Sequence, residues 1–320
     1  VLHSGRQPLH DATVVAKLHV AGAVILGKTV TTELAVYSPG KTCNPHDLAR
    51  TPGGSSSGSA AAVAAGMVPL AVGTQTNGSV IRPASFCGVY GFKPTYGLIP
   101  RHGILQQSPP LDQVGVFARS IEDTALLAEA LIGYDPNDRA TRPQAAPALT
   151  EVQAEEPPVE PKLAFVKSPV WDQADPSTQE AFQELNEALG DCCEEVALPP
   201  MFDQAHEQHR LIMEADLARS FAGEYKDGAE QLSPILKEMI ERGQQVLATE
   251  YNNAVAAIDV LNHGLSQVFE WQDAVVTPAT IGEAPIGLES TGSPSFCTIW
   301  TLCGMPAISL PLLQGADGMP

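Results

Sequence analysis

The residues most able to do chemistry in this sequence are serines in two Gly- and Ser-rich loops. The first loop is PGGSSSGSAAAVAAG at 52–66, and the second is GTQTNGSVIRPASFCGVYGFKPTYG at 73–97. A serine that follows consecutive free backbone N–H groups suits acyl transfer, because those groups stabilise an oxyanion while the hydroxyl attacks. Ser79, at the end of the turn in the second loop, has this layout. An ordinary structural turn can be just as rich in Ser and Thr, so this loop alone leaves both interpretations open.

The composition of the first loop allows three other interpretations. A flexible linker is one, although linkers rarely run directly into an Ala-rich helix. A Walker loop is a second: Gly53 and Gly58 have its spacing, but Ser59 stands where its lysine belongs, which leaves only a general anion affinity at the helix start. A nucleophile elbow at 54–58 would make Ser56 the nucleophile. The polar stretch CNPHDLARTPG before it does not resemble the strand that this elbow requires.

Taken together, the two loops resemble the amidase signature family, which includes bacterial amidases, fatty acid amide hydrolase and the A subunit of the glutamyl-tRNA amidotransferase. Further stretches that carry the resemblance are GAVILGKTVTTELA at 22–35, SIEDTALLAEAL at 120–131 and TGSPSFCTIWTLCGMPAISLP at 291–311. The resemblance implies a three-layer α/β/α fold with a large mixed β-sheet flanked by helices. It also implies an amidase that converts a carboxamide to a carboxylate and ammonia or an amine through a serine acyl-enzyme.

The same resemblance implies a Ser–cis-Ser–Lys catalytic triad. Ser79 matches the nucleophile, and Ser55 matches the bridging serine, whose preceding peptide bond is cis in the family. The family's lysine acts as a base only when neutral, so burial must lower its pKa. The remaining implied roles are backbone N–H groups of the oxyanion hole at Thr76, Asn77, Gly78 and Ser79, and supporting side chains at Ser56 and Arg82.

The family's lysine has no counterpart in this sequence. It lies in a stretch like G-x-P-x-x-x-K-D upstream of GAVILGK, and nothing similar occurs here. Lys28 belongs to a different family segment, and Lys17 lies on a predicted helix. We therefore expect the catalytic lysine to be outside this chain, the chain to be truncated at both ends, and its own amidase activity to be small or absent.

Three positions in the second loop depart from the commoner family pattern G-T-D-x-G-G-S-I-R. Gln75 removes a carboxylate beside the site, and Asn77 replaces a Gly or Ala in the oxyanion turn. Asn tolerates a positive φ, should the turn require one. Arg82 is shifted by one position. We interpret all three as variation within a subfamily.

The composition limits the partners and the compartment. A formal net charge of −19 argues against nucleic acid or an anionic membrane as the main partner. No apolar run approaches the roughly 20 residues of a membrane span, and the N-terminus lacks a signal-peptide layout. The six cysteines lack metal-type spacing, which predicts buried reduced thiols in a cytoplasmic protein. HEQH at 206–209 is expected to be a solvated helix face.

The composition predicts no metal and no cofactor, and no nucleic acid or membrane as a partner. The resemblance implies a small-molecule amide as the partner, and a homodimer is left open. Two alternatives remain. One is the A subunit of a glutamyl-tRNA amidotransferase, which uses glutamine and needs partner subunits. The other is a non-catalytic scaffold that retains the fold.

Hydrophobic periodicity and turn residues predict the elements and their grouping. Helices are expected from an Asp11 N-cap to Gly22, over 59–66, over 120–133 with a Ser120/Asp123 capping box, from Asp175 to Gly190, and through much of 203–268. Strands are expected at 23–27, 68–73, 162–166, 273–279 and 306–312. We expect one domain over 1–320, with a signature core at 1–133, a Pro/Ala/Glu-rich surface connection at 134–162, and the remaining sheet and substrate-side helices at 163–320.

Overall fold

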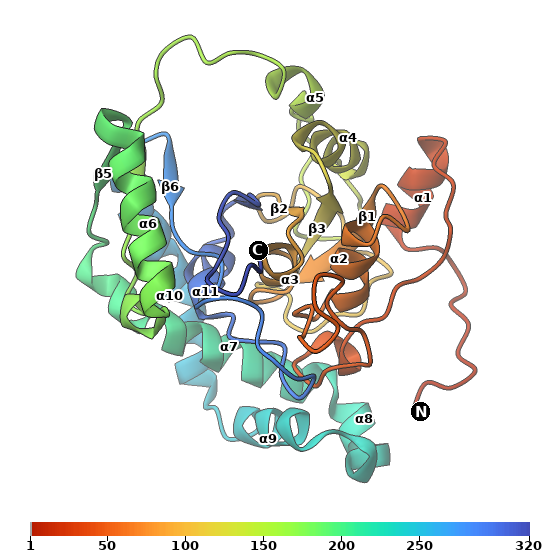
Figure 1. Ribbon diagram of the computed structural model, residues 1–320. Coiled ribbons are helices and arrows are strands. Elements are labelled where there is room, and N and C mark those ends of the chain that lie inside the picture. Colours follow the sequence, from red (N-terminus) through yellow and green to blue (C-terminus); the bar gives the residue numbers. More distant parts are fainter. Residues whose placement is uncertain (1) are drawn as a thin grey trace.

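Seven strands in the computed structural model, which describes residues 2–320, are divided between two sheets (Figure 1). One sheet is antiparallel, with the strand order β1-β3-β2-β7, and the other is parallel, with the order β5-β4-β6. The α/β class with helices flanking the sheets is confirmed. The strands are β1 Ala71–Gln75, β2 Tyr90–Lys93, β3 Gln113–Ala118, β4 Leu163–Phe165, β5 Cys193–Glu195, β6 Ala274–Val276 and β7 Ala307–Ser309.

The antiparallel sheet is the middle layer of a three-layer unit. Every residue of β3 is buried, because helices cover both of its faces. Val114 and Val116 pack on one face against α1 (Thr13–Val20) and α4 (Ile121–Leu131). Phe117 points to the other face, where it packs against α2 (Ser57–Ala64) and α3 (Ile81–Phe86). The alternation of side chains along one strand therefore builds both cores.

The parallel sheet is joined to the rest of the molecule by a second group of helices. α6 (Pro176–Leu189) connects β4 to β5, as parallel strands require. The largest core cluster unites α7 (Ala205–Ser220), α9 (Pro234–Gly243), α10 (Ala248–Val268) and α11 (Ser295–Leu302). The shorter elements are α5 Leu149–Val152, α8 Ala222–Gly228, and the 3₁₀ turns η1 Glu33–Ala35, η2 Trp171–Gln173, η3 Gly190–Cys192, η4 Pro200–Gln204 and η5 Ala229–Gln231.

The connection at 134–162 forms a long arch between α4 and β4, interrupted only by α5 (Figure 1). Its first part is anchored, since Asp135, Asp138 and Thr141 are buried. Most of the residues after 142 are exposed.

Most helices lie where the sequence predicts them. α2 and α6 end close to Gly66 and Gly190, which both have positive φ. The Ser120 hydroxyl accepts a hydrogen bond from the Asp123 N–H at 3.1 Å, as the predicted cap requires. The Asp11 cap is wrong: α1 begins at Thr13, its N-cap is Ala12, and that cap has no side-chain hydrogen bond.

The predicted strand at 23–27 is also wrong. These residues are coil, and the side chains of Val24 and Leu26 are 83% and 73% exposed. An apolar run becomes a strand only when a neighbouring strand accepts its backbone hydrogen bonds. The chain here runs instead toward the start of α2, where the Val30 carbonyl accepts from the Gly58 N–H at 2.9 Å.

Among residues 2–320, no helix combines the length and the apolar composition that crossing a bilayer would need. The six cysteines are free. Cys87, Cys193, Cys297 and Cys303 are buried, while Cys43 and Cys192 are half-buried.

Neighbouring leucines on α4 test the core of the three-layer unit. Leu127 is 4% exposed and Leu126 is 54% exposed. Leu127→Ala is expected to lower the free energy of unfolding by about 2–5 kcal/mol, because it leaves a cavity in a packed core. Leu126→Ala, on the same helix, is expected to change it by less than about 1 kcal/mol. Denaturant unfolding measures both, and equal losses would contradict the assignment of the buried face.

Candidate active site

The two serine loops lie against each other in the fold. Ser55 precedes α2, and Ser79 lies in the turn between β1 and α3; they are 1% and 8% exposed. The Ser56 N–H donates to the Ser79 carbonyl at 3.4 Å, which joins the loops directly. The peptide bond between Gly54 and Ser55 is cis. The structure therefore brings together the two serines that the sequence singles out.

Glycine allows the first loop to approach α3 this closely. Gly53 has a φ of 80°, a conformation that other residues rarely adopt. A Cβ atom at this position would lie 2.9 Å from the Cα of Pro83, which is on α3. Only a residue without a side chain fits between the loop and the helix.

The buried side chain of Arg82 connects the two loops. Its guanidinium donates to the Gly54 carbonyl at 2.7 Å and to the Gly292 carbonyl at 2.6 Å. The guanidinium also lies 5.9 Å from the centroid of the Tyr37 ring, within the range of a cation–π interaction. Arg82, one turn after Ser79, thus holds the backbone just before Ser55.

Ser56 has its hydroxyl occupied by the sheet. The Oγ atom accepts from the Thr74 N–H and donates to the Thr74 carbonyl, both at 3.2 Å. Its hydroxyl therefore fastens the start of α2 to the end of β1.

Gln75 uses both ends of its amide to shape the turn. Its Oε1 atom accepts from the Val80 and Ile81 N–H groups at 2.8 and 3.0 Å, and its Nε2 atom donates to the Thr301 hydroxyl at 2.9 Å. A carboxylate could accept but could not donate. The departure from the family's Asp therefore has a structural function, because the neutral amide links the start of α3 to α11.

Asn77 is held by its side chain as well as its backbone. Its Nδ2 atom donates to the Tyr37 hydroxyl at 3.1 Å, and its Oδ1 atom accepts from the Thr298 hydroxyl at 2.8 Å. Within residues 2–320, the non-glycine residues with positive φ are Leu34 and Ala35. Asn77 is therefore explained by its hydrogen bonds and not by a left-handed backbone.

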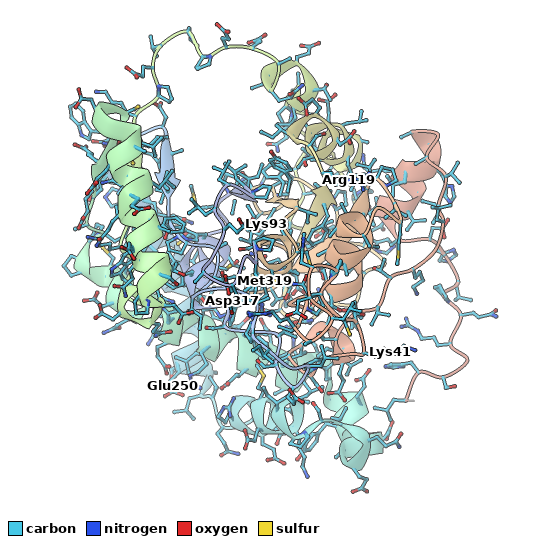
Figure 2. All side chains as sticks on the ribbon, viewed as in Figure 1. Lys41, Lys93, Arg119, Glu250, Asp317 and Met319 are labelled. Carbon is cyan, nitrogen blue, oxygen red and sulfur yellow. The ribbon has the colours of Figure 1, made fainter. Side chains whose placement is uncertain are left out.

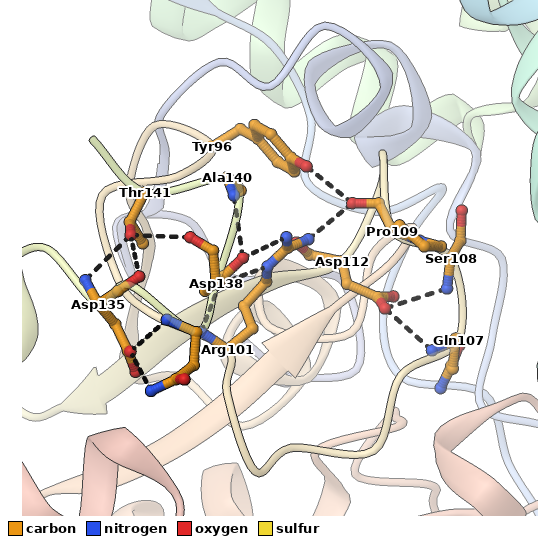
Figure 3. A network of polar contacts seen from close by, with 11 residues as sticks. Tyr96, Arg101, Gln107, Ser108, Pro109, Asp112, Asp135, Asp138, Ala140 and Thr141 are labelled. Atoms are coloured by element: carbon orange, nitrogen blue, oxygen red, sulfur yellow. Dashed lines mark hydrogen bonds and ion pairs between the residues drawn. The ribbon is translucent and has the colours of Figure 1, made fainter.

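Thr76 is fixed on two sides. Its hydroxyl donates to the Asp112 carboxylate at 2.7 Å, and its carbonyl lies 2.9 Å from His209 Nε2. Asp112 also accepts from the Gln107 and Ser108 N–H groups, as part of the network around Arg101 (Figure 3). Burial raises the pKa of Asp112 to about 6 despite these hydrogen bonds.

Four consecutive backbone N–H groups in the turn remain without a protein acceptor. Among the described residues, none accepts from the N–H groups of Thr76, Asn77, Gly78 or Ser79. Their neighbouring carbonyls are occupied, since Asn77 O accepts from the Thr301 hydroxyl and Gly78 O accepts from the Arg82 N–H. Unpaired donors next to a serine hydroxyl are the arrangement that stabilises a tetrahedral oxyanion.

A cavity of about 290 Å³ opens beside the Asn77 side chain, between α7, α9 and α11. Its wall includes Glu214, which is 1% exposed and accepts from Arg210 at 2.7 Å and from Arg242 at 2.6 and 2.9 Å. Apolar side chains such as Met213 complete the lining.

The described lysines do not reach the serines. Lys93 on β2 is buried in the interior (Figure 2), and burial lowers its pKa to about 7, the range that a lysine base needs. Its amino group, however, donates to Gln113 Oε1 and to the Met305 carbonyl. Lys17 donates to the Ile132 carbonyl at 3.0 Å. In the part of the chain that the structure describes, no lysine hydrogen-bonds with either serine, and no group of three or more His, Cys, Asp or Glu is placed to hold a metal ion.

The expectation of a solvated HEQH face is wrong for His209. This side chain is 2% exposed and contacts the carbonyl of Thr76. The signal in the sequence is its spacing, because Ile212, Met213 and Asp216 follow at the intervals of one helix face and are also buried. His206 is half-buried, and its Nε2 atom lies 2.9 Å from the Ser295 carbonyl.

Comparisons with known proteins identify the relatives of this chain. The family model described as Amidase matches residues 2–320. The A subunit of the glutamyl-tRNA(Gln) amidotransferase of Picosynechococcus sp. is 34% identical over 357 residues, which cover 99% of this chain and 74% of that protein. The structure of 6-aminohexanoate cyclic dimer hydrolase has a TM-score of 0.88 and 28% identity, covering 100% of this chain and 74% of that one. Native peptide amidase from Stenotrophomonas maltophilia has a TM-score of 0.79 and 29% identity, covering 99% and 72%.

The first of these relatives corrects the predicted partners. The prediction of a small-molecule amide with no nucleic acid or membrane, and with a homodimer left open, is wrong, because the relative is named as one subunit of a glutamyl-tRNA(Gln) amidotransferase. The exclusion of nucleic acid rested on the net charge of −19. A net charge describes the average surface of one chain and does not exclude individual macromolecular partners.

The two carbonyls that Arg82 binds provide a test of the loop geometry. Arg82→Lys is expected to lower the free energy of unfolding by about 1–3 kcal/mol, because one amino group cannot reach both carbonyls and an unpaired buried acceptor costs roughly this much. Arg139→Lys, at an exposed position, is the control and is expected to have an effect below about 0.5 kcal/mol. Denaturant unfolding measures both variants. An Arg82→Lys variant as stable as the original would contradict the bridging role.

Proposed function

Given that the chain belongs to the amidase family, we propose that it cleaves the C–N bond of a carboxamide with Ser79 as the nucleophile. The observation that carries the proposal is the row of N–H groups from Thr76 to Ser79, in a loop that the Ser56 N–H joins to the Ser55 loop. Among the described residues, these donors have no protein acceptor. They would gain one when negative charge develops on a carbonyl oxygen.

The proposed reaction has two steps. In the first, Ser79 Oγ bonds to the amide carbon while its proton passes to Ser55, and the Ser55 proton passes to a neutral base. The oxyanion accepts from the N–H groups of the turn, for which we propose Thr76, Asn77, Gly78 and Ser79. The C–N bond then breaks, and the leaving nitrogen takes the proton by the same route. In the second step, water attacks the acyl-enzyme and releases the carboxylate and Ser79.

Ser56 and Arg82 support the site without reacting in this scheme. Their hydrogen bonds fix the backbone on both sides of Ser55. The base is the missing part, since the described lysines are engaged elsewhere or exposed. We therefore propose that the 320-residue chain alone turns over unactivated amides slowly or not at all.

A second candidate is the glutaminase component of a tRNA-dependent amidotransferase. The similarity to the A subunit of glutamyl-tRNA(Gln) amidotransferase over 99% of this chain favours it. In this role the chain would release ammonia from glutamine and would work with partner subunits on a tRNA-linked substrate. The chemistry at Ser79 is the same in both candidates, so they differ in substrate and in assembly.

A glutaminase assay separates the two candidates. Ammonia release from glutamine is measured with the chain alone and with the remaining subunits of a related amidotransferase added, and benzamide is the comparison substrate. Glutamine-specific release that rises at least about tenfold with the partners supports the amidotransferase role, because binding of the partners is then coupled to the reaction at Ser79. Hydrolysis of benzamide without any response to the partners supports the free-standing amidase.

The nucleophile is tested with an activated acyl donor, which depends little on the base. The chain is mixed with p-nitrophenyl butyrate, and p-nitrophenolate release is followed together with the mass of the acylated protein. Ser79→Ala is expected to abolish acylation, and Ser55→Ala is expected to slow it by less than about tenfold, because without the base the relay serine has no group to which it can pass the proton. Ser85→Ala, on α3, is the control and should match the original chain. Acylation of the Ser79→Ala variant at the original rate would remove Ser79 as the nucleophile and favour a non-catalytic scaffold.

A further inference from the structure

We propose that His209 is a positioning residue for the oxyanion turn, and that Thr301 has the same role one peptide further along. Each side chain binds a carbonyl of the turn and thereby aims the N–H group of the same peptide unit. The inference rests on the proposed function at Ser79. It assigns to the buried face of α7 a role in catalysis that the sequence does not indicate.

The contact between His209 and Thr76 fixes the identity of the donor. The distance from Nε2 to the Thr76 carbonyl oxygen is 2.9 Å, and a carbonyl only accepts, so the proton is on Nε2. His209 is 2% exposed, and burial together with the neighbouring His206 lowers its pKa to about 4, against a rise from the Thr76 hydrogen bond. The imidazole is therefore a neutral, directional donor at neutral pH.

Thr301 donates to the next carbonyl. Its hydroxyl accepts from Gln75 Nε2 at 2.9 Å, so its single proton is available for the carbonyl of Asn77. Thr301 is fully buried on α11, which leaves the hydroxyl no water to turn toward. The hydrogen bonds therefore run in one direction, from Gln75 Nε2 to the Thr301 hydroxyl and from that hydroxyl to the Asn77 carbonyl.

The geometry of the peptide unit converts these contacts into an orientation of donors. In a trans peptide the C=O and N–H groups are coplanar and point in opposite directions. Across residues 2–320, the cis bond is the one between Gly54 and Ser55, so the units 76–77 and 77–78 are trans. The contact at Thr76 O fixes the direction of the Asn77 N–H, and the contact at Asn77 O fixes that of the Gly78 N–H.

Other contacts hold the turn in place but leave the peptide plane free. The Thr76 hydroxyl binds Asp112, and the Asn77 amide binds Tyr37 and Thr298. These bonds anchor side chains. Loss of the His209 donor would therefore leave the turn folded while the 76–77 peptide loses its fixed orientation.

The test compares a variant that removes the donor with one that keeps it. His209→Leu fills the space without an N–H group, and His209→Gln places an amide N–H near the position of Nε2. Acylation of Ser79 by p-nitrophenyl butyrate is followed over a range of concentrations, which separates the dissociation constant from the acylation rate constant. Thermal unfolding of each variant reports the structural effect.

His209→Leu is expected to lower the acylation rate constant by about 10–10³-fold, up to the effect of losing one oxyanion donor, with a dissociation constant within about twofold of the original. His209→Gln is expected to recover at least about tenfold of that loss, although both variants change the melting temperature similarly. Equal rate losses in the two variants, or a change confined to the dissociation constant, would overturn the positioning role.

Two variants of Thr301 provide an independent test in case the His209 variants fold poorly. Thr301→Val removes the hydroxyl with little change of shape, and Thr301→Ser keeps it. A lower acylation rate constant in Thr301→Val, restored in Thr301→Ser, supports the same mechanism, and equal rates in both oppose it. Failure of the proposed function is distinguishable, because Ser79→Ala would then acylate as fast as the original chain whatever the His209 and Thr301 variants do.

Discussion

The turn between β1 and α3 needs hydrogen-bond partners, and the rest of the molecule supplies most of them. It is buried, so each of its polar groups needs a partner or costs free energy. Its carbonyls and side chains find partners far away in the sequence, on α7, on α11 and near Tyr37. Among residues 2–320, the N–H groups from Thr76 to Ser79 have no protein acceptor. The fold can therefore be understood as the set of elements that satisfies everything in this turn except the donors that the reaction would use.

This need for partners explains why the two serine loops pack against each other and against α3. Gly53 lets the first loop lie against α3, and Arg82 on that helix binds the carbonyl that precedes Ser55. The arginine is fully buried and its charge is compensated mainly by carbonyl dipoles and the Tyr37 ring. Its planar fork reaches two backbone segments at once, which a lysine cannot do. The guanidinium thus helps to fix the relative position of the two serines, together with the hydrogen bond from the Ser56 N–H to the Ser79 carbonyl.

The sequence predicts well what is encoded locally. The loops around Ser55 and Ser79 carry dense patterns of small and polar residues, and the cap at Ser120 is decided by neighbours a few residues away. The strand predicted at 23–27 failed because pairing is a long-range property, and no periodicity reveals which backbone will be its neighbour. The amide of Gln75 illustrates a related limit. In the sequence, Gln75 only replaces the carboxylate of the commoner family pattern. Its amide can both accept and donate a hydrogen bond, and the donor is used in the fold because Thr301 lies beside it.

The cavity between α7, α9 and α11 shares its scaffold with the turn, and this has a consequence for engineering. Met213 lines the cavity and His209 lies one helical turn before it, so both are carried by the same helix. The cavity can be reshaped by altering the length of a side chain such as Met213 without moving the helix. A redesign that tilts α7 to enlarge the cavity would also withdraw the imidazole from the backbone that it holds. The shape of this cavity is therefore easier to tune by side-chain size than by displacement of the helix.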